Sequence, residues 1–267
     1  MTALATVLKE HVYNLNLLFR LSVNETKSKY RSHYLGGLWQ FLNPLIQIGV
    51  YWFVFGVGIR GGSPVGDVPF FLWSMTGLIP WLYIAATLNQ GTRSISSKIN
   101  VVSKMKFPVS VLPTIIMLNN VVPFVVMMIF GIMLVLFNDV FSGIYIVQLP
   151  YYLLCMAVLI YAFTLLTSTL SMIVRDIQLV VQSIVRFMMF LLPIFWIMDK
   201  LNPIFIAILK LNPFYYLIDG IRESIIGNTW FFEDMTYTLY FWSLTLFILL
   251  VASRLHIKFR NQFVDLM

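Results

Sequence analysis

Long apolar runs, separated by short polar stretches, dominate the sequence. Six of them are near or above the roughly 20 residues that a helix needs to cross a bilayer. They cover residues 38–59, 68–92, 108–137, 144–174, 177–198 and 235–253. The pattern predicts six transmembrane helices, of which the fourth and fifth are joined only by the charged turn Arg175-Asp176.

The segment between the fifth and sixth runs is apolar but too interrupted for a spanning helix. Asn202-Pro203 and Asn212-Pro213 cut it into short pieces. Because Asn is a good N-cap and Pro is favoured at the first helical position, each pair predicts the start of a short helix. We expect two short re-entrant helices here, and a surface loop folded onto the bundle is the alternative.

The first 34 residues carry apolar side chains in steps of four and three, which place them on one helical face. These residues are Leu4, Leu8, Val12, Leu15 and Phe19. The spacing predicts an amphipathic helix that lies on the inner membrane surface. An ordinary helix packed on the membrane domain explains the same pattern.

Composition supports a membrane class. The 267 residues are 60% hydrophobic and only 11% charged, and their mean hydropathy is +0.85. Soluble domains contain about 25% charged residues, so we predict an all-α integral membrane protein. The polar start of the chain predicts no cleaved signal peptide. The single Cys155 leaves no partner for an intrachain disulfide.

One membrane domain, residues 1–267, accounts for the whole chain. Its expected parts are the interfacial helix, spans one to five, the outer re-entrant segment, and span six with a cytoplasmic tail, at residues 1–34, 35–198, 199–234 and 235–267. Six helices form a poor conduit for a large substrate, so we expect a homodimer with the path on its twofold axis.

The distribution of Lys and Arg predicts the orientation. With both termini in the cytoplasm, the inner side holds thirteen of these residues and the outer side four, which are Arg60, Lys200, Lys210 and Arg222. Because inner loops carry the excess of positive charge, the opposite orientation is rejected.

Several kinds of chemistry lack the residues they need. No G-x-x-x-x-G-K-[ST] motif is present, and the glycine cluster at residues 58–66 is expected in an outer loop. His11, His33 and His256 are scattered, so no metal site is predicted. No acidic pair lies mid-membrane to couple ions. We therefore expect no catalytic residue, no cofactor and no nucleic-acid partner, and energy supplied by another subunit.

Two polar features point to contacts inside or beside the membrane. Positive charge next to a flexible backbone suits an anionic lipid head, and the candidates are Lys29, Arg31, Leu35, Gly36 and Trp39. Charges that only enforce topology are the alternative. In the fifth run, Gln178, Gln182 and Arg186 share one helical face, which is typical of an interface or a path. Snorkelling of Arg186 is the alternative.

Aromatic residues are concentrated in the first and fifth runs. Most of them are expected to face lipid or to pack against neighbours, whereas a subset can line a sugar path. The candidates that we place in a channel or lateral gate are Trp52, Phe55 and Phe190.

Five separated stretches together resemble one family. They are "HYLGGLWQFLNPLIQIGVYWFVFGVGIRGG", "SKMKFPVSVLP", "IVRDIQLVVQSIVR", "KLNPFYYLIDGIRESIIG" and "FRNQFVDLM". They are similar to the type-2 ABC exporter permeases for cell-surface polysaccharides, and most similar to the wall teichoic acid translocation permeases of Gram-positive bacteria.

The resemblance implies roles for particular residues. Leu35-Gly36 would approach the lipid diphosphate, and the first and fifth helices of opposite subunits would form a lateral opening. The short helices would form an outer gate that includes Asn202, Pro203, Asn212, Pro213 and Tyr215. Segment 98–107 and the turn at 175–176 would couple to a cytoplasmic ATPase, through Lys98, Lys104, Met105, Lys106, Phe107, Arg175 and Asp176.

The predicted function is the transmembrane subunit of an ABC exporter that moves polyprenyl-diphosphate-linked wall teichoic acid across the plasma membrane of a Gram-positive bacterium. Its partners would be two ATPase copies that bind ATP and Mg, a second copy of the chain, the lipid-linked polymer and membrane lipids. The alternatives are a permease for capsule, O-antigen or drugs, an intramembrane transferase, and a gated channel.

Overall fold

The computed structural model describes residues 3–30, 34–59, 63–98, 107–196 and 202–263. Within these ranges the regular elements are helices, and a single bridge between Val65 and Val68 is the β pairing. The predicted all-α membrane class is confirmed, because five helical segments are long and apolar enough to cross a bilayer. These segments are Gly36–Gly58, Phe70–Thr92, Val109–Phe137, Gly143–Ile173 and Met235–Gln262.

The helices follow one another with short connections. The N-terminal part contains α1 (Ala3–Tyr13), α2 (Leu15–Tyr30), the 3₁₀ turn η1 (Gly36–Leu38), α3 (Trp39–Tyr51), the π-helix η2 (Trp52–Ile59) and α4 (Phe70–Thr92). The middle contains η3 (Val109–Val111), α6 (Leu112–Phe137), η4 (Gly143–Gln148), α7 (Leu149–Ile173) and α8 (Ile177–Leu191). The last part contains α9 (Pro203–Lys210), α10 (Pro213–Ile226), α11 (Met235–Phe259) and η6 (Arg260–Gln262).

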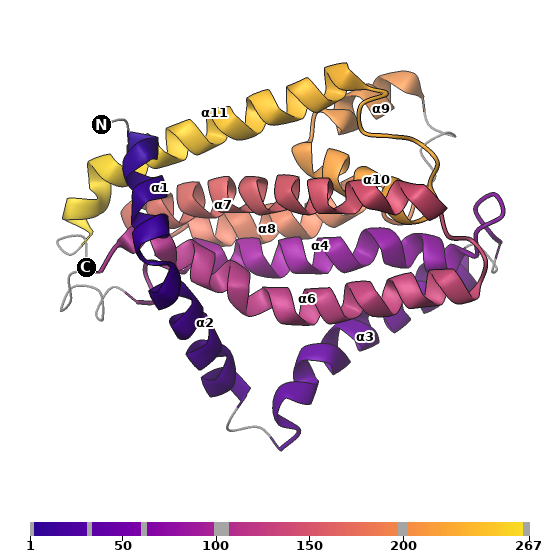
Figure 1. The fold of residues 1–267 in the computed structure, drawn as a ribbon, viewed down its shortest axis with the longest axis horizontal. Coiled ribbons are helices and arrows are strands. Elements are labelled where there is room, and N and C mark those ends of the chain that lie inside the picture. Colours follow the sequence, from indigo (N-terminus) through magenta and orange to yellow (C-terminus); the bar gives the residue numbers. More distant parts are fainter. Residues whose placement is uncertain (1–2, 31–33, 60–62, 99–106, 197–201, 264–267) are drawn as a thin grey trace.

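Helix α4 forms the centre of the bundle. It is buried on almost all sides and packs against α6, α7, α8 and α10 (Figure 1). Its apolar residues occur without a polar face, which is the pattern expected of a helix surrounded by other helices. Helix α11 packs along α7 on the other side of the bundle.

The fifth predicted span is shorter in the structure than in the sequence pattern. Helix α8 contains 15 residues and ends at Leu191, although the apolar run continues to residue 198. Fifteen residues extend about 22 Å, less than the roughly 30 Å hydrocarbon core. The helix stops because Leu192 precedes Pro193 and takes an extended conformation, with ψ of 154°.

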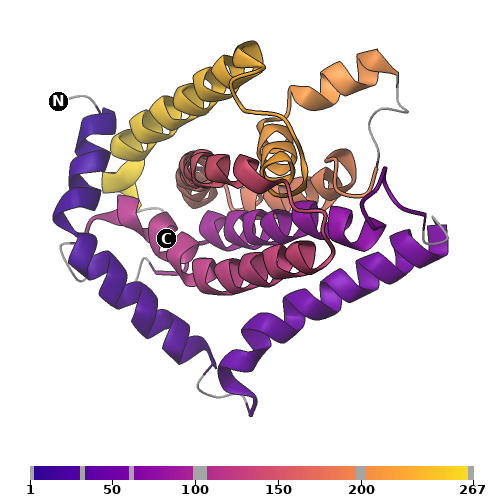
Figure 2. The same ribbon diagram turned by 45° about the vertical axis from the view of Figure 1, so that its right-hand side comes forward.

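Helices α2 and α3 diverge from the bundle and form a V in both views (Figures 1 and 2). The N- and C-terminal ends of the chain lie near one end of the bundle, and α9 lies near the opposite end (Figure 1). Helix α2 runs from the end of the bundle that holds the termini to the tip of the V (Figure 1).

The structure shows the N-terminal segment packed on the membrane domain, which was the alternative interpretation. One face of α1 and α2 packs on the protein, with Val7 and Leu18 buried. The face predicted from the apolar spacing stays largely exposed, since Leu8, Val12, Leu15 and Phe19 all lie on the surface. The segment is therefore docked on the bundle with an exposed apolar face, and its place on the inner membrane surface stays a prediction.

Candidate functional site

Polar contacts connect the turn after α4 with α2, α6 and α8 at the end of the bundle that holds the termini. The Gln178 side chain of α8 donates to Ser96 Oγ, in the turn after α4, over 3.3 Å. Lys98 in the same turn forms an ion pair with Glu25 of α2. Glu25 also accepts a hydrogen bond from Asn119 of α6 at 3.0 Å. Ser96 and Gln178, which lie two residues from the two segments predicted to couple to an ATPase, are thus in contact.

The remaining coupling candidates differ in their surroundings. Arg175 and Asp176 are exposed in the turn before α8. Phe107 packs against an apolar cluster that contains Leu18 and Ile95. Three further candidates, Lys104, Met105 and Lys106, lie outside the described residues. The assignment of this surface to ATPase coupling stays a prediction.

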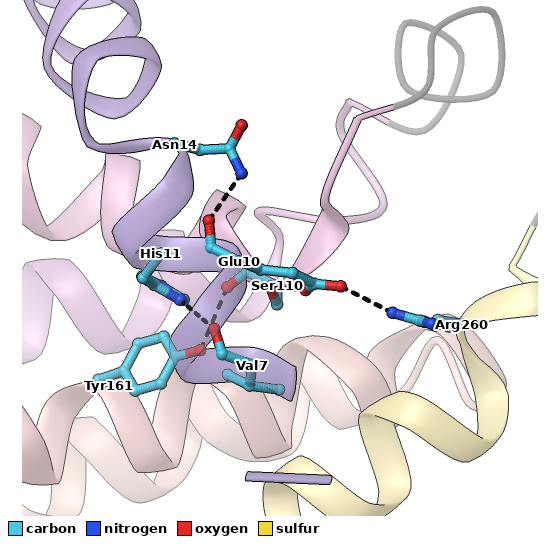
Figure 3. A network of polar contacts seen from close by, with 7 residues as sticks. All are labelled: Val7, Glu10, His11, Asn14, Ser110, Tyr161 and Arg260. Carbon is cyan, nitrogen blue, oxygen red and sulfur yellow. Dashed lines mark hydrogen bonds and ion pairs between the residues drawn. The ribbon is translucent and has the colours of Figure 1, made fainter. Parts of the chain in front are cut away.

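A carboxylate on α1 anchors the N-terminal helix next to these segments (Figure 3). Glu10 accepts a hydrogen bond from Arg260 Nη1 at 2.8 Å and another from Ser110 Oγ. Its backbone carbonyl accepts from the Asn14 side chain at 2.7 Å. One residue therefore connects α1 to η3 and to the end of α11.

His11 makes a second set of contacts from the same helix (Figure 3). Its Nδ1 lies 2.8 Å from the Val7 carbonyl oxygen and its Nε2 lies 2.8 Å from Thr114 Oγ1. Because a carbonyl only accepts, Nδ1 carries the proton and Nε2 of the neutral ring accepts from the threonine. The ring also meets Tyr161 edge-on at 5.0 Å. Burial lowers the pKa of His11 below its ordinary value.

The predicted lipid-head residues surround a sharp turn before α3. Gly36 has φ of +48°, a left-handed conformation that favours glycine, and the Leu38 N–H donates to the Leu35 carbonyl at 3.0 Å. Trp39 begins α3 directly after this turn. The Lys29 side chain and Arg31 lie outside the described residues. A lipid head at this turn stays a prediction.

Two of the predicted gate aromatics pack the first span against the segment after α8 and against α4. Phe55 stacks on Phe195 with ring centroids 4.2 Å apart and planes 7° apart, and it meets Trp196 edge-on at 6.5 Å. Trp52 meets Phe71 of α4 edge-on at 5.5 Å. These rings pack η2 within one chain, in a π-helix, a conformation that is frequent at functional sites.

The predicted polar face of α8 is exposed only at Arg186, since Gln178 and Gln182 are half-buried. Val185 and Met189 are the buried side chains of this helix, whereas Arg186 and Phe190 are exposed. Among the described residues, Arg186 has no hydrogen bond or ion pair. Gln182 is half-buried. A role of this face in a channel or lateral gate stays a prediction.

Both Asn-Pro pairs begin short helices, as predicted. Asn202 Oδ1 accepts from the Ile204 N–H and Asn212 Oδ1 accepts from the Phe214 N–H, each at 3.0 Å. The two helices, α9 and α10, are bent by 100° at the break between them. Helix α10 is not a surface loop, because most of its side chains, Tyr215 included, are buried against α4 and α7. Their role as an outer gate stays a prediction.

Sequence reasoning missed the environment of Arg222, which it placed among the outer charges. The side chain is only 5% exposed, and its guanidinium carbon lies 3.8 Å from the centroid of the Trp73 ring. Its Nε lies 3.4 Å from Thr76 Oγ1. The available signal was the helical spacing, since Ile218 and Ile225, four residues before and three after Arg222, place it on an apolar face. Cation–π stacking holds this charge inside the protein.

Sequence reasoning also missed a cavity between α3, α4 and α6 that combines carboxamides with an apolar lining. Its volume is about 310 Å³, and carboxamide side chains from all three helices line it. The signal was present in the first span, where Gln40, Asn43 and Gln47 recur at steps of three and four and thus share a helical face. The spacing alone does not say what this face contacts, and in the structure most of α3 is exposed.

Long apolar helices around a buried α4, with a broken helix pair at one end, define a multi-pass membrane protein of the transporter type. The chain belongs to the ABC-2 type transporter family, whose model matches residues 16–226. This confirms the predicted ABC-2 permease family.

Known relatives extend this similarity over the length of the chain. The O-antigen export system permease protein RfbA of Myxococcus xanthus is 30% identical over 178 residues, which are 67% of each chain. The protein of the same name from Klebsiella pneumoniae is 25% identical over 269 residues, 96% of this chain and 98% of the relative. A specificity for wall teichoic acid is not confirmed by these similarities.

Proposed function

We propose that this chain is the membrane subunit of an ATP-driven exporter for a lipid-linked cell-surface polysaccharide. The observation that carries the proposal is its similarity to permeases named for O-antigen export, over 96% of its length in one case. These relatives favour the broader class of lipid-linked polysaccharides over teichoic acid, so the teichoic acid cargo stays a narrower prediction.

The contacts at the end of the bundle that holds the termini support coupling to a partner. The Ser96–Gln178 hydrogen bond and the Lys98–Glu25 ion pair join the turns after α4 and α7 to α2, so a push on either turn reaches the interfacial helix. The ATPase would bind ATP and Mg, and this chain would contribute no catalytic residue. Two ATPase copies on a permease homodimer would match the symmetry of such an assembly.

The exposed residues of α8 and of α3 support a path that this chain forms together with a second copy. Charged phosphates cannot cross hydrocarbon unaided, so the polymer needs a protein-lined route. Arg186 on α8 has no partner among the described residues, and a second subunit or a substrate phosphate would supply one. The capped pair α9 and α10 would close the outer end of this route.

The first test is purification of the tagged chain from its native membrane in mild detergent. We expect a roughly stoichiometric cytoplasmic ATPase whose hydrolysis rises when a lipid-linked oligosaccharide is added. Stimulation by hydrophobic small molecules alone would favour a drug exporter. Ion conduction without nucleotide would favour a channel, and a chain without associated ATP hydrolysis would contradict the exporter.

A charge reversal tests the coupling surface. The double variant Lys104→Glu/Lys106→Glu is expected to lose the ATPase and to reduce glycan-stimulated hydrolysis at least tenfold. Arg20→Glu, an exposed reversal on α2, is the matched control and should retain both. Full ATPase binding and export by the double variant would overturn the coupling role of segment 98–107.

A further inference from the structure

The cavity between α3, α4 and α6 has a composition that stands out in an apolar chain. Five carboxamides line it, on Gln40, Asn43 and Gln47 of α3, Gln90 of α4 and Asn120 of α6. No charged side chain is among the described residues that line it. Its volume of about 310 Å³ is at the lower end of small-molecule sites. The cavity, named here the amide cleft, is built for a neutral polar group.

The carboxamides on α4 and α6 are only weakly satisfied. Asn120 is buried, and its Nδ2 lies 3.3 Å from Thr87 Oγ1 and 3.4 Å from Gln90 Oε1. Both distances exceed the usual range for N–H···O hydrogen bonds. A buried amide normally makes its hydrogen bonds in full. These two side chains can therefore accept a further partner from the cavity.

The carboxamides on α3 have no partner at all among the described residues. Gln40, Asn43 and Gln47 make no hydrogen bond there, although they lie in the first half of a candidate span. Pro44 lies between them and has no N–H to donate to the Gln40 carbonyl. Unsatisfied polar groups at membrane depth are costly, so a partner from outside this chain that supplied hydrogen bonds would stabilise them.

The chemistry of the lining indicates what that partner is. Carboxamides both donate and accept hydrogen bonds, as hydroxyl groups do. Anions are held by Arg, Lys or helix N-termini, and the lining offers no such charge. Trp39 adds an indole N–H and a flat apolar face. A ring with several hydroxyl groups satisfies all of these groups together.

We propose that the amide cleft binds the sugar ring of a lipid-anchored glycan. A lipid-anchored glycan can reach this site from the membrane side, because Asn43 and Gln47 are exposed on the surface of a spanning helix. Two sources have this chemistry, the exported glycan near its lipid anchor and a resident membrane glycolipid. The first source rests on the proposed function, whereas sugar binding itself does not.

The test uses the full chain with its ATPase in phosphatidylcholine nanodiscs. The probe is a monoglucosyl diacylglycerol, and the comparison lipid is the diacylglycerol with the same acyl chains and no sugar. Native mass spectrometry measures the retention of each lipid. We expect at least tenfold tighter binding of the glucosyl lipid. Equal binding of the two lipids by the unaltered chain would overturn the proposal whatever the variants do.

Variants locate the binding in the cavity. Asn43→Leu/Gln47→Leu should reduce the preference for the glucosyl lipid to less than threefold. Asn16→Leu removes an exposed amide from α2 and should leave the preference unchanged. An unchanged preference in the double variant would overturn the site. The double variant Gln47→Cys/Cys155→Ser gives a second test. An efficient disulfide between residues 47 of two subunits would also overturn the site, because the α3 carboxamides would then face the second subunit and not a sugar.

Competition separates the two sources. Displacement of the glucosyl lipid by a lipid-linked oligosaccharide assigns the cleft to the exported glycan. Retention of the glucosyl lipid under the same conditions assigns it to a membrane glycolipid. If the lipid-linked oligosaccharide does not stimulate ATP hydrolysis while the glucosyl lipid still binds with its preference, the proposed function fails and the sugar site stands.

Discussion

Glu10 and Arg260 form an ion pair of 2.8 Å between residues at opposite ends of the chain. The pair joins α1 to the segment that follows α11, and Ser110 donates to the same carboxylate. Both side chains are partly exposed, so the pair by itself contributes little, but the shared hydroxyl makes it part of a network. Helix α1 is thereby held to the rest of the domain.

Loss of this carboxylate should loosen the N-terminal helix. Glu10→Gln is expected to lower stability by about 1 kcal/mol, because a partly exposed ion pair and one charge-assisted hydrogen bond weaken. Thermal unfolding in detergent measures the change. Arg254→Gln, an exposed charge on α11, is the control and should have no effect. Equal melting temperatures for Glu10→Gln and the unaltered chain would contradict the anchoring role.

His11 should make stability depend on pH. Its pKa in the folded chain is lowered by burial below the ordinary value of 6.5, so the unfolded chain binds the proton more readily. The stability associated with the neutral ring is therefore present above about pH 6.5 and is lost as the pH falls through the lowered pKa. His11→Gln keeps hydrogen-bonding capacity and does not titrate.

The comparison of melting temperatures at pH 8 and pH 5.5 tests this linkage. The decrease on acidification should be smaller in His11→Gln than in the unaltered chain, and contributions from other groups cancel in the difference. An equal decrease in both proteins would show that His11 is protonated as easily in the folded state as in the unfolded one.

Gly220 should not tolerate a side chain. A Cβ there would lie 1.9 Å from Cε1 of the buried Tyr152, at the contact between α10 and α7. Gly220→Ala is expected to cost about 1–3 kcal/mol through overpacking. Gly49→Ala is the matched control, since nothing lies within 4 Å of its Cβ, and it should be neutral or stabilising. Thermal unfolding compares them, and rescue of Gly220→Ala by Tyr152→Leu would confirm the contact.

The Asn212 cap should be needed for the start of α10. Asn212→Ala removes the acceptor of the Phe214 N–H and is expected to cost about 1 kcal/mol, whereas Asn212→Ser or Asn212→Asp should retain most of the stability. Melting temperatures and detergent-stable yield measure the loss. If Asn212→Ala and Asn212→Ser behave alike, the side-chain oxygen does not cap the helix.

Local features of the chain were predictable from the sequence. The apolar runs identified the five long helices because hydrocarbon thickness sets their length, and the Asn-Pro pairs identified the starts of α9 and α10 because caps act within one turn. The end of α8 was missed by the hydropathy pattern, since Leu192 is apolar. Its extended conformation comes from Pro193 and not from polarity.

Contacts between distant residues were decided only by the tertiary structure. The sequence predicted Arg222 as one of the outer charges, whereas the packing of α10 on α4 places its guanidinium over the Trp73 ring. Gln40, Gln90 and Asn120 are separated along the chain and form one cavity only because three helices meet. The sequence by itself determined the membrane class, the helix lengths and the capped breaks, since these depend on neighbouring residues. The buried charge, the amide cleft and the N-terminal anchor depend on how the helices pack, which no local pattern contains.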